Sequence, residues 1–124
     1  MESDSRILVA DDDPDVLKAA AVALTRAGST VVTAARLEEL HAVSPEAFDA
    51  VLLDMNFAPG ARDGNEGLAT LAELRQRDPA LGVVLMTTWG GVALAVEGIR
   101  RGASNFVLKP WRNEALVGVV AEAV

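Results

Sequence analysis

Short apolar runs alternate with segments of helical periodicity along the whole chain, and this alternation most constrains the fold. Five runs rich in valine, leucine or isoleucine are expected to be strands, at residues 7–10, 30–33, 50–53, 83–86 and 105–108. Such runs are typical of parallel strands that are buried on both faces. Helices must then cover both faces of the sheet, so the pattern predicts an α/β fold.

The segments between these runs carry apolar residues at helical spacing. The first helix is expected to begin after an N-cap at Asp13, with Pro14 in the first helical position, and to end at Gly28. Further helices are expected over residues 37–42, 68–77, 92–101 and 116–124. Five strands and five helices with right-handed crossovers fit a doubly wound, flavodoxin-like (βα)5 sheet of order 2-1-3-4-5.

Length and composition exclude several functions. A chain of 124 residues, half of them hydrophobic, forms one domain with one core. Its net charge of -7 argues against direct binding of nucleic acid or of an anionic membrane. The absence of cysteine and the single histidine argue against thiol and zinc chemistry. No signal peptide or membrane span is evident, so the cytoplasm is the expected compartment.

Polar residues follow four of the predicted strands. These residues are Asp11 and Asp12 after the first strand, Asp54 after the third, Thr87 after the fourth and Lys109 after the fifth. Because ligands bind at the carboxyl ends of the strands in such sheets, we expect these side chains to converge. Several carboxylates in one crevice repel each other unless a cation lies among them. Asp13 is expected to cap a helix and is excluded from this site.

These residue types are the ones that phosphoryl transfer to a carboxylate requires. An aspartate is a weak nucleophile toward phosphorus unless a cation neutralises the phosphoryl oxygens. Mg²⁺, or Mn²⁺ in its place, prefers oxygen ligands such as carboxylates. A lysine ammonium and a threonine hydroxyl can contact the remaining phosphoryl oxygens.

The motifs at these strand ends resemble those of the receiver domain of bacterial two-component response regulators. They are Val9-Ala10-Asp11-Asp12-Asp13-Pro14, Leu53-Asp54-Met55, Met86-Thr87-Thr88 and Lys109-Pro110. The resemblance implies that a sensor histidine kinase phosphorylates Asp54. It further implies that Asp12, Asp54 and the Asn56 carbonyl bind Mg²⁺, with Asp11 acting through water. Thr87 would be the switch hydroxyl, Lys109 the phosphate-binding ammonium before a cis Pro110, and Phe106 the rotating ring.

A narrower resemblance, carried by residues 53–57, 64–68 and 102–111, is to receivers fused to sigma-54-dependent transcriptional activators. It implies that the chain is the N-terminal part of a longer protein with a transcriptional output domain. A homodimer is expected through the last two strands and the helices beside them. Residues 57–63 form a loop about two residues longer than is usual in the family. Thr88 and Trp89 are expected to modulate access of water to Asp54, with the indole slowing dephosphorylation.

Two alternative functions stay open at this stage. Phosphatases of the haloacid dehalogenase class also use an aspartate nucleophile and Mg²⁺, and Asp11-Asp12-Asp13 matches the start of their motif. Asp15, however, departs from that motif, and 124 residues leave little room for a cap domain. A pseudo-receiver that binds partners without phosphorylation is the other alternative, although all the expected functional positions hold competent residues. The leading interpretation is a signalling domain and not an enzyme.

Overall fold

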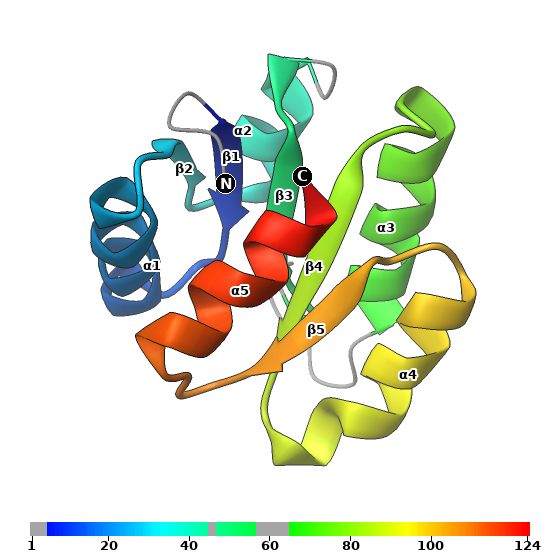
Figure 1. Ribbon diagram of the computed structural model, residues 1–124. Helices are drawn as coiled ribbons and strands as arrows, with labels where there is room; N and C mark the ends of the chain where they lie inside the picture. Colours follow the sequence, from blue (N-terminus) through cyan, green and yellow to red (C-terminus); the bar gives the residue numbers. More distant parts are fainter. Residues whose placement is uncertain (1–4, 45–46, 57–64) are drawn as a thin grey trace.

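A computed structural model describes residues 5–44, 47–56 and 65–124 of the chain. Strands and helices alternate along the described residues (Figure 1). The strands are β1 (Arg6–Ala10), β2 (Thr30–Ala34), β3 (Ala50–Asp54), β4 (Gly82–Thr87) and β5 (Asn105–Leu108). The α-helices are α1 (Pro14–Arg26), α2 (Leu37–Ala42), α3 (Asn65–Arg77), α4 (Val92–Arg100) and α5 (Asn113–Ala123), and a short 3-10 helix, η2 (Trp89–Gly91), precedes α4.

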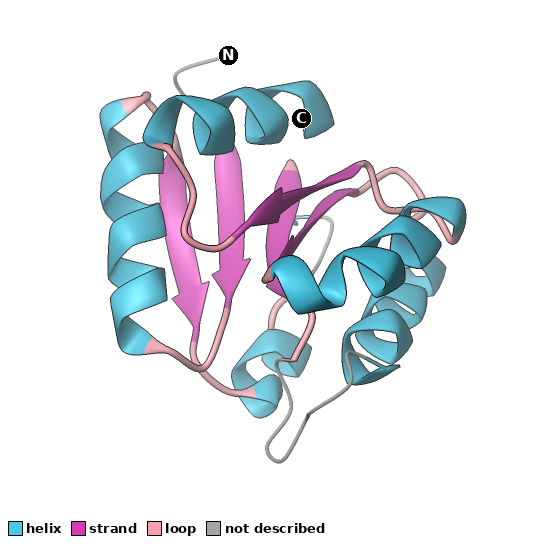
Figure 2. Cartoon of the chain, turned by 90° about the horizontal axis from the view of Figure 1, so that it is seen from below, coloured by secondary structure: helices cyan, strands magenta, loops and turns pink. Residues whose placement is uncertain are grey.

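The five strands form one parallel sheet in the order β2-β1-β3-β4-β5. Helices α1 and α5 cover one face, and α2, α3 and α4 cover the other, so the sheet lies between two helical layers (Figure 2). The predicted flavodoxin-like fold and strand order are therefore confirmed. The chain reverses its direction of winding between β1 and β3, which makes the carboxyl ends of these two strands the expected binding crevice.

Alternate residues of the buried strands supply two hydrophobic cores. On the α1 and α5 side, Ile7, Leu52 and Met86 pack against Leu24 and Leu116. The core on the opposite side joins the strands to the inner surfaces of α2 and α3, through Leu8, Val51, Leu85, Leu40 and Leu71. All of β3 and all of β4 are buried, so the two strands that end in Asp54 and Thr87 lie inside the core.

Helix α3 begins three residues before the predicted start at residue 68. Gly67 lies in the first turn of this helix, and its missing side chain has a packing role. A Cβ atom on Gly67 would overlap the backbone carbonyl of Met55. The absence of a side chain lets the first turn of α3 lie directly on the chain leaving β3, immediately after Asp54.

The last helix ends at Ala123, one residue before the predicted end at residue 124, and Val124 is exposed. In the described part of the chain, none of the helices combines the length and apolar character needed to cross a membrane. The predicted long loop at residues 57–63 lies outside the described residues.

Candidate functional site

Three carboxylates meet at the carboxyl ends of β1 and β3. Ala10 pairs with Leu53 in the sheet, so the next residues along the two strands, Asp11 and Asp54, come side by side. Carboxylate oxygens of Asp11, Asp12 and Asp54 all lie within 4.8 Å of one another. Asp11 is completely buried and Asp54 is 6% exposed, whereas Asp12 is exposed to solvent. The predicted convergence of these three residues is confirmed.

Lys109 forms ion pairs with two of the three carboxylates. Its ammonium group donates a hydrogen bond to Asp11 Oδ2 at 2.6 Å and another to Asp54 Oδ1 at 3.0 Å. Its backbone continues from β5, and the Lys109 amide donates to the Thr87 carbonyl at 2.7 Å. The following peptide bond, Lys109–Pro110, is cis, as the resemblance implied. The single ammonium group of Lys109 is therefore paired with two buried carboxylates, and the carboxylate of Asp12 lies beside them.

Burial and the neighbouring groups shift the pKa values of two residues in this cluster. Burial raises the pKa of Asp11, and the negative charge of Asp54 adds to this effect, while hydrogen bonds from Lys109 and from the Asp13 amide oppose it. Burial lowers the pKa of Lys109, but its hydrogen bond to Asp11 and the charges of Asp54 and Asp11 outweigh burial and raise it above 10.5. The protein therefore holds the lysine charged while it disfavours ionisation of Asp11.

Thr87 is the last residue of β4 and pairs with Leu108 of β5. It is 3% exposed, and its hydroxyl donates a hydrogen bond to the Thr88 carbonyl at 3.3 Å. Thr87 nevertheless lines the same cavity as the carboxylates and Lys109. In this conformation the hydroxyl satisfies its hydrogen bond locally, next to the turn that leads into α4.

A cavity of about 290 Å³ contains most of the predicted site. It is lined by Asp11, Asp12, Asp13, Asp54, Asn56, Thr87, Thr88 and Lys109. Asp13 also caps α1, because its Oδ1 accepts a hydrogen bond from the Asp15 amide at 2.9 Å, as predicted. The lining of this cavity is mostly polar, and Asp54 is part of it.

Two residues of the predicted site do not line this cavity. Trp89 begins η2 and is 78% exposed. Its indole therefore does not cover Asp54 in this conformation, and the structure gives no support to the predicted shielding from water. Phe106 is half-buried and packs against the core beneath α3 and α4. Thr88 is the one of the two predicted modulating residues that does line the cavity.

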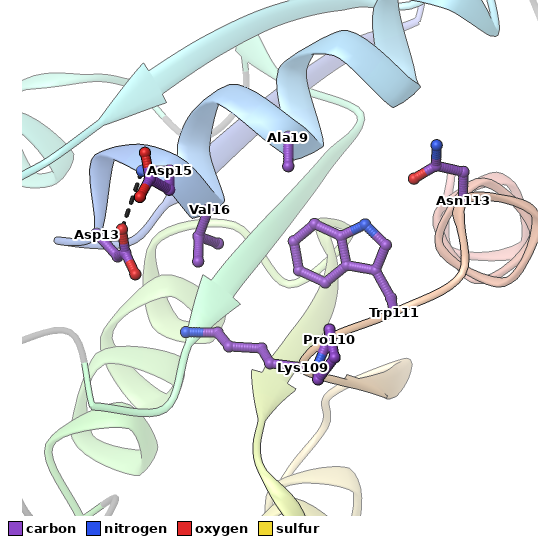
Figure 3. Close-up of a pocket in the computed structure, with 8 residues that line it drawn as sticks. All are labelled: Asp13, Asp15, Val16, Ala19, Lys109, Pro110, Trp111 and Asn113. Atoms are coloured by element: carbon purple, nitrogen blue, oxygen red, sulfur yellow. Dashed lines mark hydrogen bonds between the residues drawn. The ribbon is translucent and has the colours of Figure 1, made fainter.

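Trp111 had no assigned role in the sequence-based interpretation. In Figure 3 its ring lies between α1, which contributes Val16 and Ala19, and the Lys109-Pro110 turn. These residues line a second, mainly apolar cavity of about 460 Å³, with Asp13 and Asp15 at its edge. The side chain of Lys109 runs along this cavity and reaches into the acidic one, so Trp111 packs beside the turn that positions the ammonium group.

The donor set fits a divalent cation that prefers oxygen. Asp12 and Asp54 offer carboxylates, Asn56 lies in the same cavity, and no nitrogen or sulfur ligand is present among the described residues that line it. Burial raises the pKa of Asp11 and the charge of Asp54 adds to this rise, so a further cation beside the three carboxylates would reduce their mutual repulsion. The carboxylates could therefore hold a metal ion.

Comparison with known proteins identifies the family of this chain. The family model of the response regulator receiver domain matches residues 7–121. The chain is 31% identical over 121 residues to the transcriptional regulatory protein GlrR of Escherichia coli, covering 97% of this chain and 26% of that relative. It is 34% identical over 118 residues to the response regulator protein FleR of Pseudomonas aeruginosa, covering 94% of this chain and 24% of FleR.

Solved structures give the same result. The signal receiver domain of a response regulator from Bacteroides fragilis has a TM-score of 0.85 and 38% identity, covering 96% of this chain and 95% of that one. The receiver domain of NtrX from Brucella abortus has a TM-score of 0.84 and 36% identity, covering 94% and 96% of the two chains. The chain spans about a quarter of the length of GlrR and FleR. The chain belongs to the response regulator receiver domain family of two-component systems.

Proposed function

We propose that this receiver domain is a phosphorylation-driven switch in which Asp54 accepts a phosphoryl group from a sensor histidine kinase. The observation that carries the proposal is the position of Asp54 within the acidic cluster. It ends the central strand, lies next to Asp11 and Asp12, and receives a hydrogen bond from Lys109 at 3.0 Å. A carboxylate in this position has a cation beside it and an open cavity in front of it.

The transfer follows from this arrangement. A carboxylate oxygen of Asp54 forms a bond to phosphorus while the bond between phosphorus and the kinase histidine nitrogen breaks, and that nitrogen keeps the electron pair. Lys109 offsets negative charge on the phosphoryl oxygens, and the Thr87 hydroxyl can donate to one of them. Asp12, Asp54 and the Asn56 carbonyl would hold Mg²⁺, with Asp11 acting through water. When bound, the ion neutralises charge on the carboxylates and on the phosphoryl group.

The family match favours this function over that of a phosphatase, because the receiver domain is a signalling domain. Its output is then a shift between two conformations, biased by the charge on Asp54. The transcriptional regulators among its relatives favour a transcriptional output domain in the whole protein, of the sigma-54-dependent type that the sequence indicated. We propose that such a protein acts in the cytoplasm and that DNA is contacted by another domain.

The same proposal includes a homodimer through the surface formed by β4, α4, β5 and α5. On α4, Val96 and Ile99 are exposed, with 42% and 38% of their surfaces accessible. Trp89 adds a third exposed apolar residue next to α4. These side chains are where a second copy of the chain would bury apolar surface after phosphorylation.

Incubation with acetyl phosphate and Mg²⁺ tests the central claim. Intact-mass measurement should show one added phosphoryl group in the wild-type chain and none in Asp54→Asn. Asp15→Asn is the matched control, since Asp15 is an exposed aspartate of α1 outside the cavity that contains Asp54. Phosphorylation that persists in Asp54→Asn would show that another residue is the acceptor, and equal loss in Asp15→Asn would show a general effect of charge.

A further inference from the structure

Gly91 lies directly against the side chain of Thr87, where β4 leads into α4. A Cβ atom built on Gly91 would overlap Thr87 Oγ1 and would lie 3.3 Å from Thr87 Cβ. Thr87 is buried, and Gly91 forms one wall of the space that its hydroxyl occupies. The hydroxyl can take this position only because residue 91 has no side chain.

The Thr88 carbonyl holds the hydroxyl in that space. It accepts a hydrogen bond from the Gly91 amide at 2.9 Å and one from Thr87 Oγ1 at 3.3 Å. The second bond is long, since hydroxyl donors usually lie about 2.7–2.8 Å from their acceptors. Thr87 can therefore exchange it for a stronger, charge-assisted bond to an anion in the cavity.

We propose that the missing side chain of Gly91 sets the resting orientation of Thr87 and thereby the equilibrium of the switch. The inference rests on the proposed function, in which the Thr87 hydroxyl contacts a phosphoryl group on Asp54. It assigns a role to Gly91, which lies outside the cavity: this residue sets the fraction of molecules in which the Thr87 hydroxyl can contact the phosphoryl group. Gly91 is a positioning residue, because it acts only through Thr87.

Rotamer geometry shows how a side chain at residue 91 would act on Thr87. The Thr87 side chain has three staggered positions, which hold Oγ1, Cγ2 and a hydrogen. With a methyl group on residue 91, only the hydrogen fits the position that Oγ1 now occupies, because Cγ2 is larger than the hydroxyl. One χ1 rotamer satisfies this condition, and it removes the hydroxyl from the Thr88 carbonyl. The backbone of Gly91, with φ -103° and ψ 6°, is open to alanine.

The test is the affinity for beryllofluoride, a mimic of the phosphoryl group, measured at saturating Mg²⁺ on the 124-residue chain. Gly90→Ala is the matched control, because nothing lies within 4 Å of a Cβ atom on Gly90. We expect Gly91→Ala to bind at least about threefold more tightly than wild type, since apparent affinity scales with the fraction of competent molecules. Gly90→Ala should match wild type. An equal or weaker affinity in Gly91→Ala overturns the inference.

A second pair of variants separates this role from a general effect on α4. In a Thr87→Ala background the hydroxyl is gone, so adding Gly91→Ala should leave the remaining affinity unchanged. A gain that persists there overturns the inference. Should Gly91→Ala fail to fold, side-chain couplings of wild-type Thr87 measured by NMR take its place. They should report a change of χ1 rotamer when beryllofluoride binds, and an unchanged rotamer overturns the inference. Failure of wild type to bind beryllofluoride would instead overturn the proposed function, and this inference with it.

Discussion

Replacing Lys109 by methionine removes the cation that serves both buried carboxylates and keeps a side chain of similar length. Lys109 donates hydrogen bonds to Asp11 and to Asp54, and only 19% of its side chain is exposed. The side chains of Asp11 and Asp54 are 1% and 8% exposed, so neither can turn fully into solvent when its partner is lost. The substitution therefore leaves uncompensated buried charge in the metal-free protein.

The two hydrogen bonds of Lys109 give the size of the expected loss in the free energy of unfolding. A hydrogen bond to a charged group contributes about 1.5–3 kcal/mol, so two such bonds set an upper range of about 3–6 kcal/mol. Water reaches part of the ammonium group and reduces that value, while removal of one partner from a buried ion pair costs about 3–5 kcal/mol. We expect Lys109→Met to lower the free energy of unfolding by about 3 kcal/mol at pH 7 without Mg²⁺.

The loss of stability in Lys109→Met should depend on pH, and the pKa of Asp11 gives the direction of this dependence. Burial already raises the pKa of Asp11, and the hydrogen bond from Lys109 opposes that rise. Without the lysine, the pKa of Asp11 rises further, so the folded variant retains a proton that the unfolded chain releases above pH 3.8. A group with a raised pKa in the folded state loses its stabilising contribution as pH rises through that pKa. The difference between wild type and Lys109→Met should therefore shrink toward pH 4 and grow toward pH 7.

Urea unfolding followed by circular dichroism, at several pH values and with or without Mg²⁺, measures this difference. Lys18→Met is the matched control, because Lys18 is the other lysine of the chain and lies exposed on α1. It should change stability little at any pH. Mg²⁺ should stabilise Lys109→Met more than wild type, since it supplies the missing positive charge. A loss no larger than that of Lys18→Met, or one that is constant with pH, would refute the reasoning.

Three further predictions test the surroundings of the site. Mg²⁺ should raise the melting temperature of wild type by several degrees and that of Asp12→Asn much less, and equal stabilisation in calorimetry would contradict direct ligation by Asp12. Gly82→Ala should cost about 2 kcal/mol in urea unfolding because its Cβ would overlap the Ala123 carbonyl, whereas Gly118→Ala, with open space around it, should stabilise α5 by about 0.5–1 kcal/mol. Trp89→Ala should leave the rate of loss of the aspartyl phosphate unchanged, because the indole is 78% exposed; a tenfold faster loss would show that the ring closes over Asp54.

The position of the site could be predicted from the sequence because it depends only on the order of the strands. Parallel strands of order 2-1-3-4-5 bring their carboxyl ends to one edge, so Asp54, Thr87 and Lys109 had to meet there once that order was adopted. Short apolar runs are enough to predict such strands, whichever apolar side chains they contain. The Asp13 cap was predictable for a similar reason, since it depends on contacts within two residues.

Side-chain directions depend on contacts that no local pattern encodes. Lys109 donates its shorter hydrogen bond to Asp11, which is 98 residues away in sequence. The orientation of Trp89 depends on the 3-10 turn before α4, and the sequence there reads only as a glycine-containing segment. The contact between Gly91 and Thr87 is likewise visible only when β4 and η2 are placed together.

The unphosphorylated site already holds more acidic groups than basic ones, and phosphorylation of Asp54 would change this balance of charge. Lys109 donates one hydrogen bond to Asp11 and one to Asp54, and Asp11 remains a buried carboxyl group with a raised pKa. A phosphoryl group on Asp54 carries about -1.5 to -2 charges at pH 7 and three acceptor oxygens, more than the carboxylate it replaces. Lys109 is then drawn toward these oxygens, and Thr87 gains an acceptor better than the Thr88 carbonyl. Thr87 ends β4 and Lys109 follows β5, and the next segments lead to α4 and α5. In the proposed switch, a local change of charge would therefore be passed to the surface where Val96 and Ile99 are exposed.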